Sequence, residues 1–473
     1  MPNLIIINPG GGNVIYQNLD TDLTAIEPPL WARLIAGYCE DRGHSVEIVD
    51  MQFDVGEHVH ETPLLYCIAA YGHQPSASTQ SMEAVNEWVK AYKENGNTVP
   101  IIIVGGHAAA LPERTLRETG ADYVCTGEGP QTVEALLRVQ KGDLGNVPGL
   151  AWINAEGEYD TTPAAPLLDL SELHGNTWDL LPMDKYRAHG WQCLDGSPRT
   201  PYASIYTSLN CPYKCVFCCI SAPFGGPGYQ TRNPDDVVAE VAHLYHEYGV
   251  TTIKIIDEMF ILKKHHYRAI CEGLAALPFA HELNIWCYGR ADTVLDEDLA
   301  LFRRAGIRWI ALGIESGSEH VRDGAAKTLS SDDIRHIVHS IQAAGISVIA
   351  NYIFGLSDDT METMQETLDL AIELNTEFSN FYVAQAYPGS ALFDQAHPAD
   401  LPERWSGYSQ HSYDTKGLPT DTLTSKEVLA FRDMAFDKYF TNPRYLNMLI
   451  QKFGFGASSE IRKMVSVKLE RAA

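Results

Sequence analysis

Two series of short apolar segments alternate with amphipathic helical segments along most of this chain. The apolar runs of the first series are LIIIN (4–8), SVEIVD (45–50), LLYCIAA (64–70), IIIVGG (101–106) and DYVCTG (122–127). Continuous apolar strands separated by helices are typical of a parallel sheet that is covered on both faces. We therefore expect residues 1–145 to form a doubly wound, Rossmann-like α/β domain.

The second series begins near residue 201 and is more regular. Its apolar runs are ASIYTSLN (203–210), TIKIIDEMF (252–260), NIWCYGRAD (284–292), WIALGIESG (309–317), SVIANYIFG (347–355) and NFYVAQAYPG (380–389). Six strand–helix units are too few to close an eight-unit barrel, so we predict a partial (β/α)6 TIM-like barrel over 201–395. We expect residues 146–200 to link the two domains, and the aromatic-rich, then helical residues 396–473 to cap the barrel.

The composition limits the cellular compartment and the kinds of partner that we expect. The net charge is −26 and no basic patch is visible, so we do not expect a nucleic-acid partner. No apolar run reaches the roughly 18 residues of a membrane span, and the first residues do not have the pattern of a secretory signal. We therefore expect a cytoplasmic protein without a membrane partner, in which reduced cysteines bind metal or act in catalysis rather than form disulfides.

Glycine is frequent where the strands of the first series end. The loops there read NPGGG (8–12), YGHQ (71–74), GGHAAA (105–110) and GEGP (127–130). Doubly wound sheets bind ligands at the carboxyl ends of their strands, and glycine lets the backbone approach a ligand closely. Ordinary turn chemistry remains an alternative. A dinucleotide is disfavoured because no G-x-G-x-x-G follows the first strand.

The segment CPYKCVFCC (211–219) follows the first strand of the second series. Cys211, Cys215 and Cys218 have the spacing C-x3-C-x2-C, and Cys219 adjoins the third cysteine. Zinc normally takes four ligands, and no second cysteine or histidine pair lies nearby. Three thiolates on an iron–sulfur cluster would leave one iron open for another ligand. The spacing alone leaves both metals possible, and we expect Cys219 to be a bystander.

CPYKCVFC at this position, together with PPLWARLIAGYCEDRGHSVEIVD (28–50), VGGHAAALPERTLRETGADYVCTGEGPQTVEALL (104–137) and LGIESGSEHV (312–321), resembles one family. This is the radical S-adenosylmethionine (SAM) family whose members carry an N-terminal cobalamin (B12)-binding domain, the class B methyltransferase-like branch. The resemblance covers nearly all of residues 1–395. It implies a 4Fe-4S cluster on Cys211, Cys215 and Cys218, whose open iron chelates SAM. It also implies an electron donor such as flavodoxin or ferredoxin, because the reduced cluster cleaves SAM to a 5′-deoxyadenosyl radical.

The resemblance also assigns residues to SAM. It places Phe217 near the adenine, Asp257 and Glu258 at the methionine ammonium, Arg290, Glu315 and Ser316 near the methionine carboxylate and ribose, and Gly355 beside the adenine. One departure is that IDE (256–258) replaces the commoner two glycines and glutamate. A salt bridge at the barrel rim is the alternative for each single charged residue.

For cobalamin the resemblance implies contacts along the glycine-rich strand ends. The candidates are Gly10, Gly11, Gly12, Pro29, Gly72, His73, Gly105, Gly106, His107, Gly127, Glu128 and Gly129. The chain does not contain the D-x-H-x-x-G motif that supplies a histidine ligand to cobalt in methionine-synthase-like domains. His73 is predicted to lie under the corrin as a ligand or a spacer, or else to be an ordinary hydrogen-bonded loop residue.

The function implied is methylation of an unactivated carbon of a small molecule, natural product or peptide, through a 5′-deoxyadenosyl radical and methylcobalamin. The alternatives are a cyclase, ring-contracting or oxidative enzyme of the same branch, or a cobalamin-binding sensor or carrier. A tRNA methylthiotransferase is disfavoured because Cys39, Cys67 and Cys125 are expected on a helix and two strands. The sequence does not identify a catalytic side chain.

Overall fold

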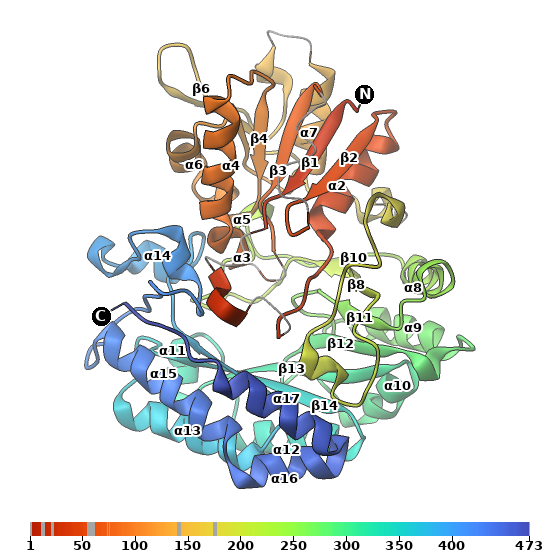
Figure 1. Cartoon of the computed structure of the whole chain (residues 1–473), viewed down its shortest axis with the longest axis vertical. Helices are drawn as coiled ribbons and strands as arrows, with labels where there is room; N and C mark the ends of the chain where they lie inside the picture. The colour runs from red at the N-terminus through yellow and green to blue at the C-terminus, as the bar shows by residue number, and fades with distance from the viewer. Residues whose placement is uncertain are drawn as a thin grey trace.

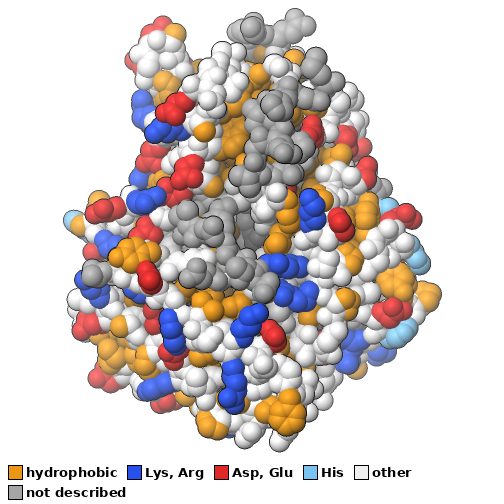
Figure 2. Space-filling model, viewed as in Figure 1, with side chains coloured by type: hydrophobic (Ala, Val, Ile, Leu, Met, Phe, Trp, Pro, Cys, Tyr) orange, Lys and Arg blue, Asp and Glu red, His pale blue; other side chains and the backbone are white. Residues whose placement is uncertain are grey.

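The computed structural model describes residues 2–10, 15–19, 23–53, 62–72, 74, 76–139, 143–173 and 177–472. An N-terminal α/β unit stands above a second α/β unit, and the C-terminal helices lie along the second unit (Figure 1). Gly11, Gly12 and His73, which were predicted to contact cobalamin, lie outside the described residues. On the face in Figure 2, acidic, basic and apolar side chains are interspersed. No helix of the described segments is both long and apolar enough to cross a bilayer.

The N-terminal unit is a seven-stranded sheet in the order β2-β1-β3-β4-β5-β6-β7. Its strands are β1 (Leu4–Asn8), β2 (Val46–Asp50), β3 (Leu65–Ala69), β4 (Ile101–Val104), β5 (Tyr123–Cys125), β6 (Leu150–Ile153) and β7 (Tyr159–Thr161). Strands β1 to β5 pair in parallel, as predicted, whereas β6 and β7 pair antiparallel. The predicted boundary at residue 145 is therefore wrong: the first part of the expected linker 146–200 is a hairpin that covers the edge of β5.

Helices cover both faces of this sheet. They are α2 (Leu30–Glu40), α3 (Ala77–Gln80), α4 (Met82–Glu94), α5 (Gly106–Ala110), α6 (Pro112–Thr119) and α7 (Pro130–Arg138). Two separate apolar cores follow from this arrangement. One packs Val85 and Leu116 against Ile5, and the other packs Ile35 and Val133 against Ile6. Because adjacent strand residues point to opposite faces, the continuous apolar runs are explained and the doubly wound domain is confirmed.

The second unit is a six-stranded parallel sheet in the order β15-β14-β13-β12-β11-β8. Its strands are β8 (Tyr202–Ile205), β11 (Thr252–Ile255), β12 (Asn284–Gly289), β13 (Ile307–Glu315), β14 (Ser347–Phe354) and β15 (Phe378–Val383). The helices between them are α8 (Pro234–Tyr248), α9 (Lys264–Ala275), α10 (Leu299–Arg304), α11 (Glu319–Gly324), α12 (Ser331–Ala343) and α13 (Met361–Leu374). Strands β8 and β15 form the two edges, which confirms the predicted partial barrel.

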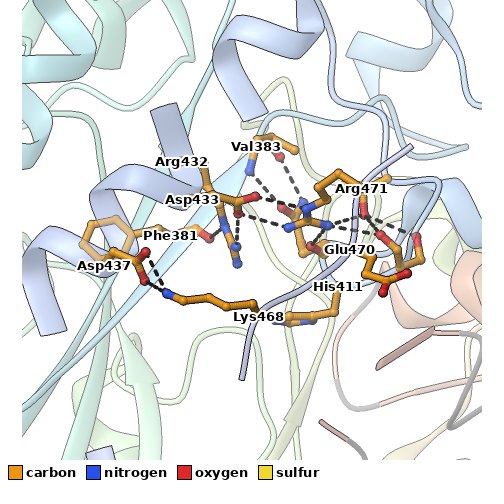
Figure 3. A network of polar contacts seen from close by, with 12 residues as sticks. Phe381, Val383, His411, Arg432, Asp433, Asp437, Lys468, Glu470 and Arg471 are labelled. Atoms are coloured by element: carbon orange, nitrogen blue, oxygen red, sulfur yellow. Dashed lines mark hydrogen bonds and ion pairs between the residues drawn. The ribbon is translucent and has the colours of Figure 1, made fainter. Parts of the chain in front are cut away.

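The C-terminal segment covers the wall of the barrel beside β15. It contains α14 (Ala391–Gln395), α15 (Ser425–Phe440), α16 (Pro443–Phe453) and α17 (Phe455–Ser466). Arg471, beyond the last helix, ties the tail to α15 and to a preceding loop, because its guanidinium contacts Asp433 (3.0 Å) and the carbonyls of Gln410 and Ser412 (3.1 Å each) (Figure 3).

Buried polar contacts join the two units. Glu27 of the N-terminal unit pairs with Lys254 of β11 at 3.2 Å, with both side chains almost fully enclosed. Arg33 of α2 pairs with Glu240 of α8 at 3.0 Å, and Glu240 also pairs with Arg232 at 2.6 Å. A buried charge is tolerated only when it is paired and hydrogen-bonded. These contacts therefore fix the N-terminal sheet above the barrel.

Candidate functional site

The carboxyl ends of both parallel sheets border two adjoining cavities. The larger, of about 310 Å³, lies at the end of the N-terminal sheet and is lined by Gly10 and Pro29 among others. The smaller, of about 30 Å³, reaches the cysteine loop and is lined by Gly106, Cys219 and Glu258 among others. The residues that line both cavities are Trp31, Tyr71, Gly72 and Ile256. Ligands of the two sheets would therefore meet in one region.

The cysteine loop is folded back on itself at the end of the short strand β9 (Ser208–Leu209). Asn210 has φ of 67°, a left-handed conformation that asparagine tolerates better than most residues. Its side-chain oxygen accepts the Cys211 amide at 2.7 Å, and the Cys218 amide donates to the Cys215 carbonyl at 3.1 Å. The loop thus positions its three predicted ligands through its own backbone.

The three predicted ligands are half-buried, whereas Cys219 is only 7% exposed. Burial raises the pKa of the Cys211 thiol to about 11. Burial also raises the pKa of Cys215, whereas the nearby cations Lys327 and Arg290 lower it. Among the described residues, no three Cys, His, Asp or Glu side chains converge closely enough to hold one metal ion. A zinc ion needs such convergence, whereas the thiolates of a 4Fe-4S cluster each bind a different iron. Three thiols on one loop, with Lys327 and Arg290 near Cys215, fit an anionic cluster.

Asp257 and Glu258 follow β11, and their surroundings differ. Asp257 is fully buried and accepts hydrogen bonds from the Thr207 amide and the Ser208 hydroxyl, both at 2.6 Å. Glu258 lines the smaller cavity and makes no hydrogen bond or ion pair to a described residue. Burial raises the pKa of Glu258 to about 8, against the opposing effect of Lys254. Of the two acids, Glu258 is therefore the one open to a ligand in the cavity, whereas Asp257 braces the loop before the cysteines.

Arg290, at the end of β12, packs on the cysteine loop. Its guanidinium lies 4.0 Å from the centre of the Tyr213 ring and pairs with Asp292 at 2.9 Å. The predicted contact with the methionine carboxylate would compete with that ion pair. Tyr213 lies between two of the cluster cysteines, so Arg290 also supports the loop that holds them.

Glu315 and Ser316 end β13 and make different contacts. Glu315 has φ of 66° and forms a short ion pair with Lys327. Gly313 lies directly beneath this ion pair: a Cβ at Gly313 would lie within 2.5 Å of both the Glu315 carboxylate and the Lys327 ammonium. The Ser316 hydroxyl instead faces Thr367 of α13 at 3.1 Å. The structure therefore leaves Glu315 near the cysteine loop and turns the Ser316 side chain away from it.

Phe217 and Gly355, both predicted to lie near the adenine, have different surroundings. Phe217 packs with Leu356, the residue after Gly355, in a small apolar cluster. Gly355 has φ of 81°, and a Cβ there would lie 2.6 Å from Val428 of α15. Its amide donates to Asp359 at 2.9 Å. Glycine is needed here for the turn and for helix packing.

The glycines predicted to contact cobalamin divide into two groups. At Gly72, Gly105 and Gly129, an added Cβ would lie 2.1 to 2.5 Å from atoms of the domain itself, so packing alone requires glycine. At Gly106 and Gly127 the nearest atom is 3.8 Å from the added Cβ. Gly10, with φ of 66° and its nearest atom 3.4 Å from an added Cβ, lines the larger cavity, as Gly72 does. At Gly10, Gly106 and Gly127 a large ligand could therefore lie against the backbone.

His107 and Glu128 are less accessible than expected. His107 is 1% exposed, lies edge-on to the Trp405 ring at 4.4 Å, and burial lowers its pKa to about 3. Glu128 is buried, accepts the Leu168 amide at 2.8 Å, and burial raises its pKa to about 7. In this structure both side chains therefore support packing, His107 against the C-terminal segment and Glu128 against the interdomain connection.

Sequence reasoning missed two residues of the site, Lys327 and Trp31. Lys327 follows α11 with no motif around it, and only its ion pair with Glu315 identifies it. Trp31 stacks on Tyr71 at 4.5 Å and donates to the Tyr206 hydroxyl at 2.8 Å, so it forms the wall shared by the two cavities. Its position in a predicted amphipathic helix gave no signal beyond packing.

Comparison with known proteins agrees with this architecture. The B12 binding domain model matches residues 19–137, and the radical SAM superfamily model matches residues 205–371. The chain is therefore a cobalamin-binding radical SAM enzyme, and its cofactors are a 4Fe-4S cluster, SAM and cobalamin. The predicted family, fold and cofactors are confirmed.

Individual relatives cover most of the chain. An uncharacterized methyltransferase of Pyrococcus horikoshii is 27% identical over 83% of this chain and 83% of its own. An anaerobic magnesium-protoporphyrin IX monomethyl ester cyclase of Rubrivivax gelatinosus is 25% identical over 95% of this chain and 79% of its own. The fold matches the radical SAM methyltransferase TsrM of Kitasatospora setae, solved with cobalamin and a 4Fe-4S cluster, with a TM-score of 0.66 and 18% identity over 83% of this chain and 74% of that one.

Proposed function

We propose that this enzyme methylates an unactivated carbon of a small molecule or peptide. The observation that carries the proposal is that the glycine-edged end of the cobalamin-binding sheet and the cysteine loop of the barrel border adjoining cavities with a shared wall. A methyl group held by cobalamin and a radical formed at the cluster could both reach one substrate there. Proximity of the reacting groups is what such a transfer requires.

When bound, the cofactors supply a transferable methyl group and a 5′-deoxyadenosyl radical that removes a hydrogen atom from the substrate. Cys211, Cys215 and Cys218 would hold the cluster. Glu258 would accept the methionine ammonium, because it is a carboxylate without a partner beside that loop. Phe217 would pack against the adenine, next to Leu356. The walls formed by Trp31 and Tyr71 would exclude water from the reacting groups.

Each methylation would consume two molecules of SAM. One gives up its methyl group and leaves as S-adenosylhomocysteine. The other would be cleaved reductively to methionine and the radical that becomes 5′-deoxyadenosine. Each turnover would take two electrons from a donor such as flavodoxin or ferredoxin, one for that cleavage and one to return the cobalamin to the state that accepts the next methyl group. His73, a predicted neighbour of the corrin, can be tested by comparing cobalamin absorption and EPR spectra of wild type and His73→Ala; unchanged spectra would remove it as a ligand.

A second candidate is a radical cyclization without methyl transfer. It is favoured by the Rubrivivax gelatinosus cyclase, which aligns with 95% of this chain. The two candidates share the radical step, and they differ in whether S-adenosylhomocysteine accumulates with the product.

The deciding experiment uses the full chain, anaerobically reconstituted with iron, sulfide and cobalamin, and incubated with SAM, reductant and candidate substrates. Methyl transfer predicts 5′-deoxyadenosine and S-adenosylhomocysteine together with a product heavier by one CH₂. Deoxyadenosine and a new product without S-adenosylhomocysteine would favour the cyclase. Cobalamin binding with neither nucleoside product would indicate a sensor or carrier.

A further inference from the structure

Alternate residues of β14 and β15 face opposite sides of the barrel wall. Tyr352 and Phe381 stack at 5.4 Å, and Phe381 lies 5.6 Å from Tyr439 of α15, ring centre to ring centre. Phe354 likewise meets Phe431 of α15 at 5.1 Å. These aromatic side chains therefore point outward, toward the helix.

Side chains alternate along a strand, so the intervening residues Asn351, Ile353, Asn380 and Tyr382 point into the barrel. All four are partly exposed, whereas the outward residues of the same strands are fully buried. Because these side chains face the inside of the barrel wall, their partial exposure indicates that they border accessible space there.

The inward amides form a ladder with one unused acceptor. Asn351 and Asn380 are register partners on neighbouring strands. The Asn351 amide nitrogen donates to the Leu312 carbonyl at 3.1 Å, and the Asn380 amide nitrogen donates to the Asn351 side-chain oxygen at 2.9 Å. The Asn380 side-chain oxygen accepts no hydrogen bond from a described residue. Because the ladder fixes its orientation, this oxygen is a positioned acceptor.

Two phenols lie on the same inner surface. Tyr288 of β12 packs edge-on against Trp286 at 5.0 Å, and Tyr382 belongs to β15. Neither hydroxyl hydrogen-bonds to a described residue, and burial raises the pKa of both, so both remain neutral donors. Figure 3 shows how β15 is held on either side of Tyr382: Arg432 donates to the Phe381 carbonyl at 2.7 Å, and the Val383 amide donates to the Gln410 side chain at 2.9 Å.

The amino end of the barrel is closed by Trp191. Its ring stacks on Phe378 at 5.4 Å and meets Trp286 and Trp309 edge-on at 5.5 and 5.4 Å. The inner surface formed by Tyr288, Asn380 and Tyr382 therefore lies between this plug and the cysteine loop at the carboxyl end. A substrate portion held there would lie inside the barrel, with the rest of the substrate extending toward the cavities where the proposed methyl donor and radical meet.

The charges around this inner surface are neutralised in pairs. Lys254 pairs with Glu27 at 3.2 Å, Lys327 pairs with Glu315, and Arg432 pairs with Asp433 at 2.7 Å. Glu258 differs from these groups because it has no ion-pair partner among the described residues, and in the proposed function it binds the ammonium group of SAM. Nothing else in the described part of this surface offers an unpaired charge, so burying a charged group there would be costly.

We infer that Tyr288, Asn380 and Tyr382 are the specificity-determining residues, and that they bind a substrate portion that is uncharged and carries both hydrogen-bond donors and acceptors. Asn380 accepts a hydrogen bond from the substrate, and the two phenols donate to it. This inference rests on the proposed function, because it assigns these residues to the part of the substrate that enters the radical-forming barrel.

The test uses three probes of matched size: benzamide, which is neutral, benzoate, which is an anion, and benzylammonium, which is a cation. Each is titrated into the anaerobic holoenzyme with SAM and reductant, and the half-maximal change in substrate-independent 5′-deoxyadenosine formation gives its apparent affinity. Benzamide is expected to act at a concentration roughly tenfold below either ion. A preference for an ion, or equal or undetectable responses to all three probes, would overturn the inference.

Two substitutions sharpen the test. Tyr382→Phe removes one hydroxyl and should weaken benzamide about five- to tenfold, with cluster and cobalamin spectra unchanged. Asn380→Asp should shift the preference toward benzylammonium. Tyr248→Phe, on the outer helix α8, is the matched control and should change neither. An unaltered benzamide response in Tyr382→Phe would remove Tyr382 from the site. This readout does not require methyl transfer, so absence of S-adenosylhomocysteine would contradict the proposed function alone.

Discussion

The two parallel sheets present their carboxyl ends to the same region, yet they present different chemistry. The N-terminal sheet offers glycines and backbone, with open space at Gly106 and Gly127. The barrel offers thiols, a carboxyl at Glu258 that has no hydrogen-bond or ion-pair partner among the described residues, and the cations Arg290 and Lys327. The first surface suits a large ligand recognised by shape, whereas the second suits small charged groups fixed at points. Substitutions at the end of the N-terminal sheet should therefore act by filling space, whereas substitutions in the barrel should act by changing charge.

The largest effect is expected at the cysteines. Replacing Cys211, Cys215 or Cys218 with Ala should abolish cluster assembly and deoxyadenosine formation, because each thiolate binds its own iron. Cys219→Ala should retain the cluster. Iron and sulfide analysis with visible absorption checks this. Loss of iron in Cys219→Ala would mean that the fourth cysteine is a ligand or supports the loop.

The next effect separates the two adjacent acids. Glu258→Gln should weaken SAM binding roughly 10- to 100-fold, because a charge-assisted hydrogen bond is lost. Asp257→Asn should mainly lower stability, because Asp257 accepts from Thr207 and Ser208 within the fold. Equilibrium dialysis with SAM and urea unfolding measure the two effects. A larger loss of SAM affinity in Asp257→Asn would reverse the assignment.

A smaller effect concerns pH and the N-terminal sheet. The pKa of Glu128 is raised to about 7 by burial, above its usual 4.5, so the folded state binds the extra proton between these values. Its contribution to the free energy of unfolding therefore falls by about 3 kcal/mol as the pH rises from about 4.5 to 7. Glu128→Gln should remove this dependence and be more stable than wild type at pH 8, as measured by urea unfolding of the cobalamin-free protein. Parallel pH profiles for the two proteins would contradict it.

The smallest effect compares two glycines of the same sheet end. Gly129→Ala should cost about 1 to 2 kcal/mol, because φ is 116° and the new Cβ would lie 2.5 Å from Val104. Gly106→Ala should change stability by less than about 0.5 kcal/mol, because the nearest atom is 3.8 Å away. Thermal unfolding measures both. Equal losses would show that open space does not distinguish the two positions.

Much of the fold could be predicted because the signals were local. The strands of both sheets follow from short apolar runs, and Asn233 and Gly249 bracket α8 as N-cap and C-cap. The hairpin β6–β7 was missed because its strands are short and only pairing with β5 defines them. The cysteine ligands and Glu258 could be proposed from motif position, whereas the burial of His107 could not, because Trp405 is almost 300 residues away.

The sequence by itself determined the order of the two domains, the parallel pairing of β1 to β5 and of the barrel strands, and the spacing of the three cysteines, because periodicity and spacing act over a few residues. Only the tertiary structure decided which neighbouring acid is free, which glycines border open space and which asparagine keeps an unused acceptor. Those properties depend on side chains from distant strands and helices, and on whether their charges and hydrogen bonds are already satisfied. Local sequence patterns indicated which segments carry the reactive residues, and long-range packing decided which of those side chains can contact a ligand.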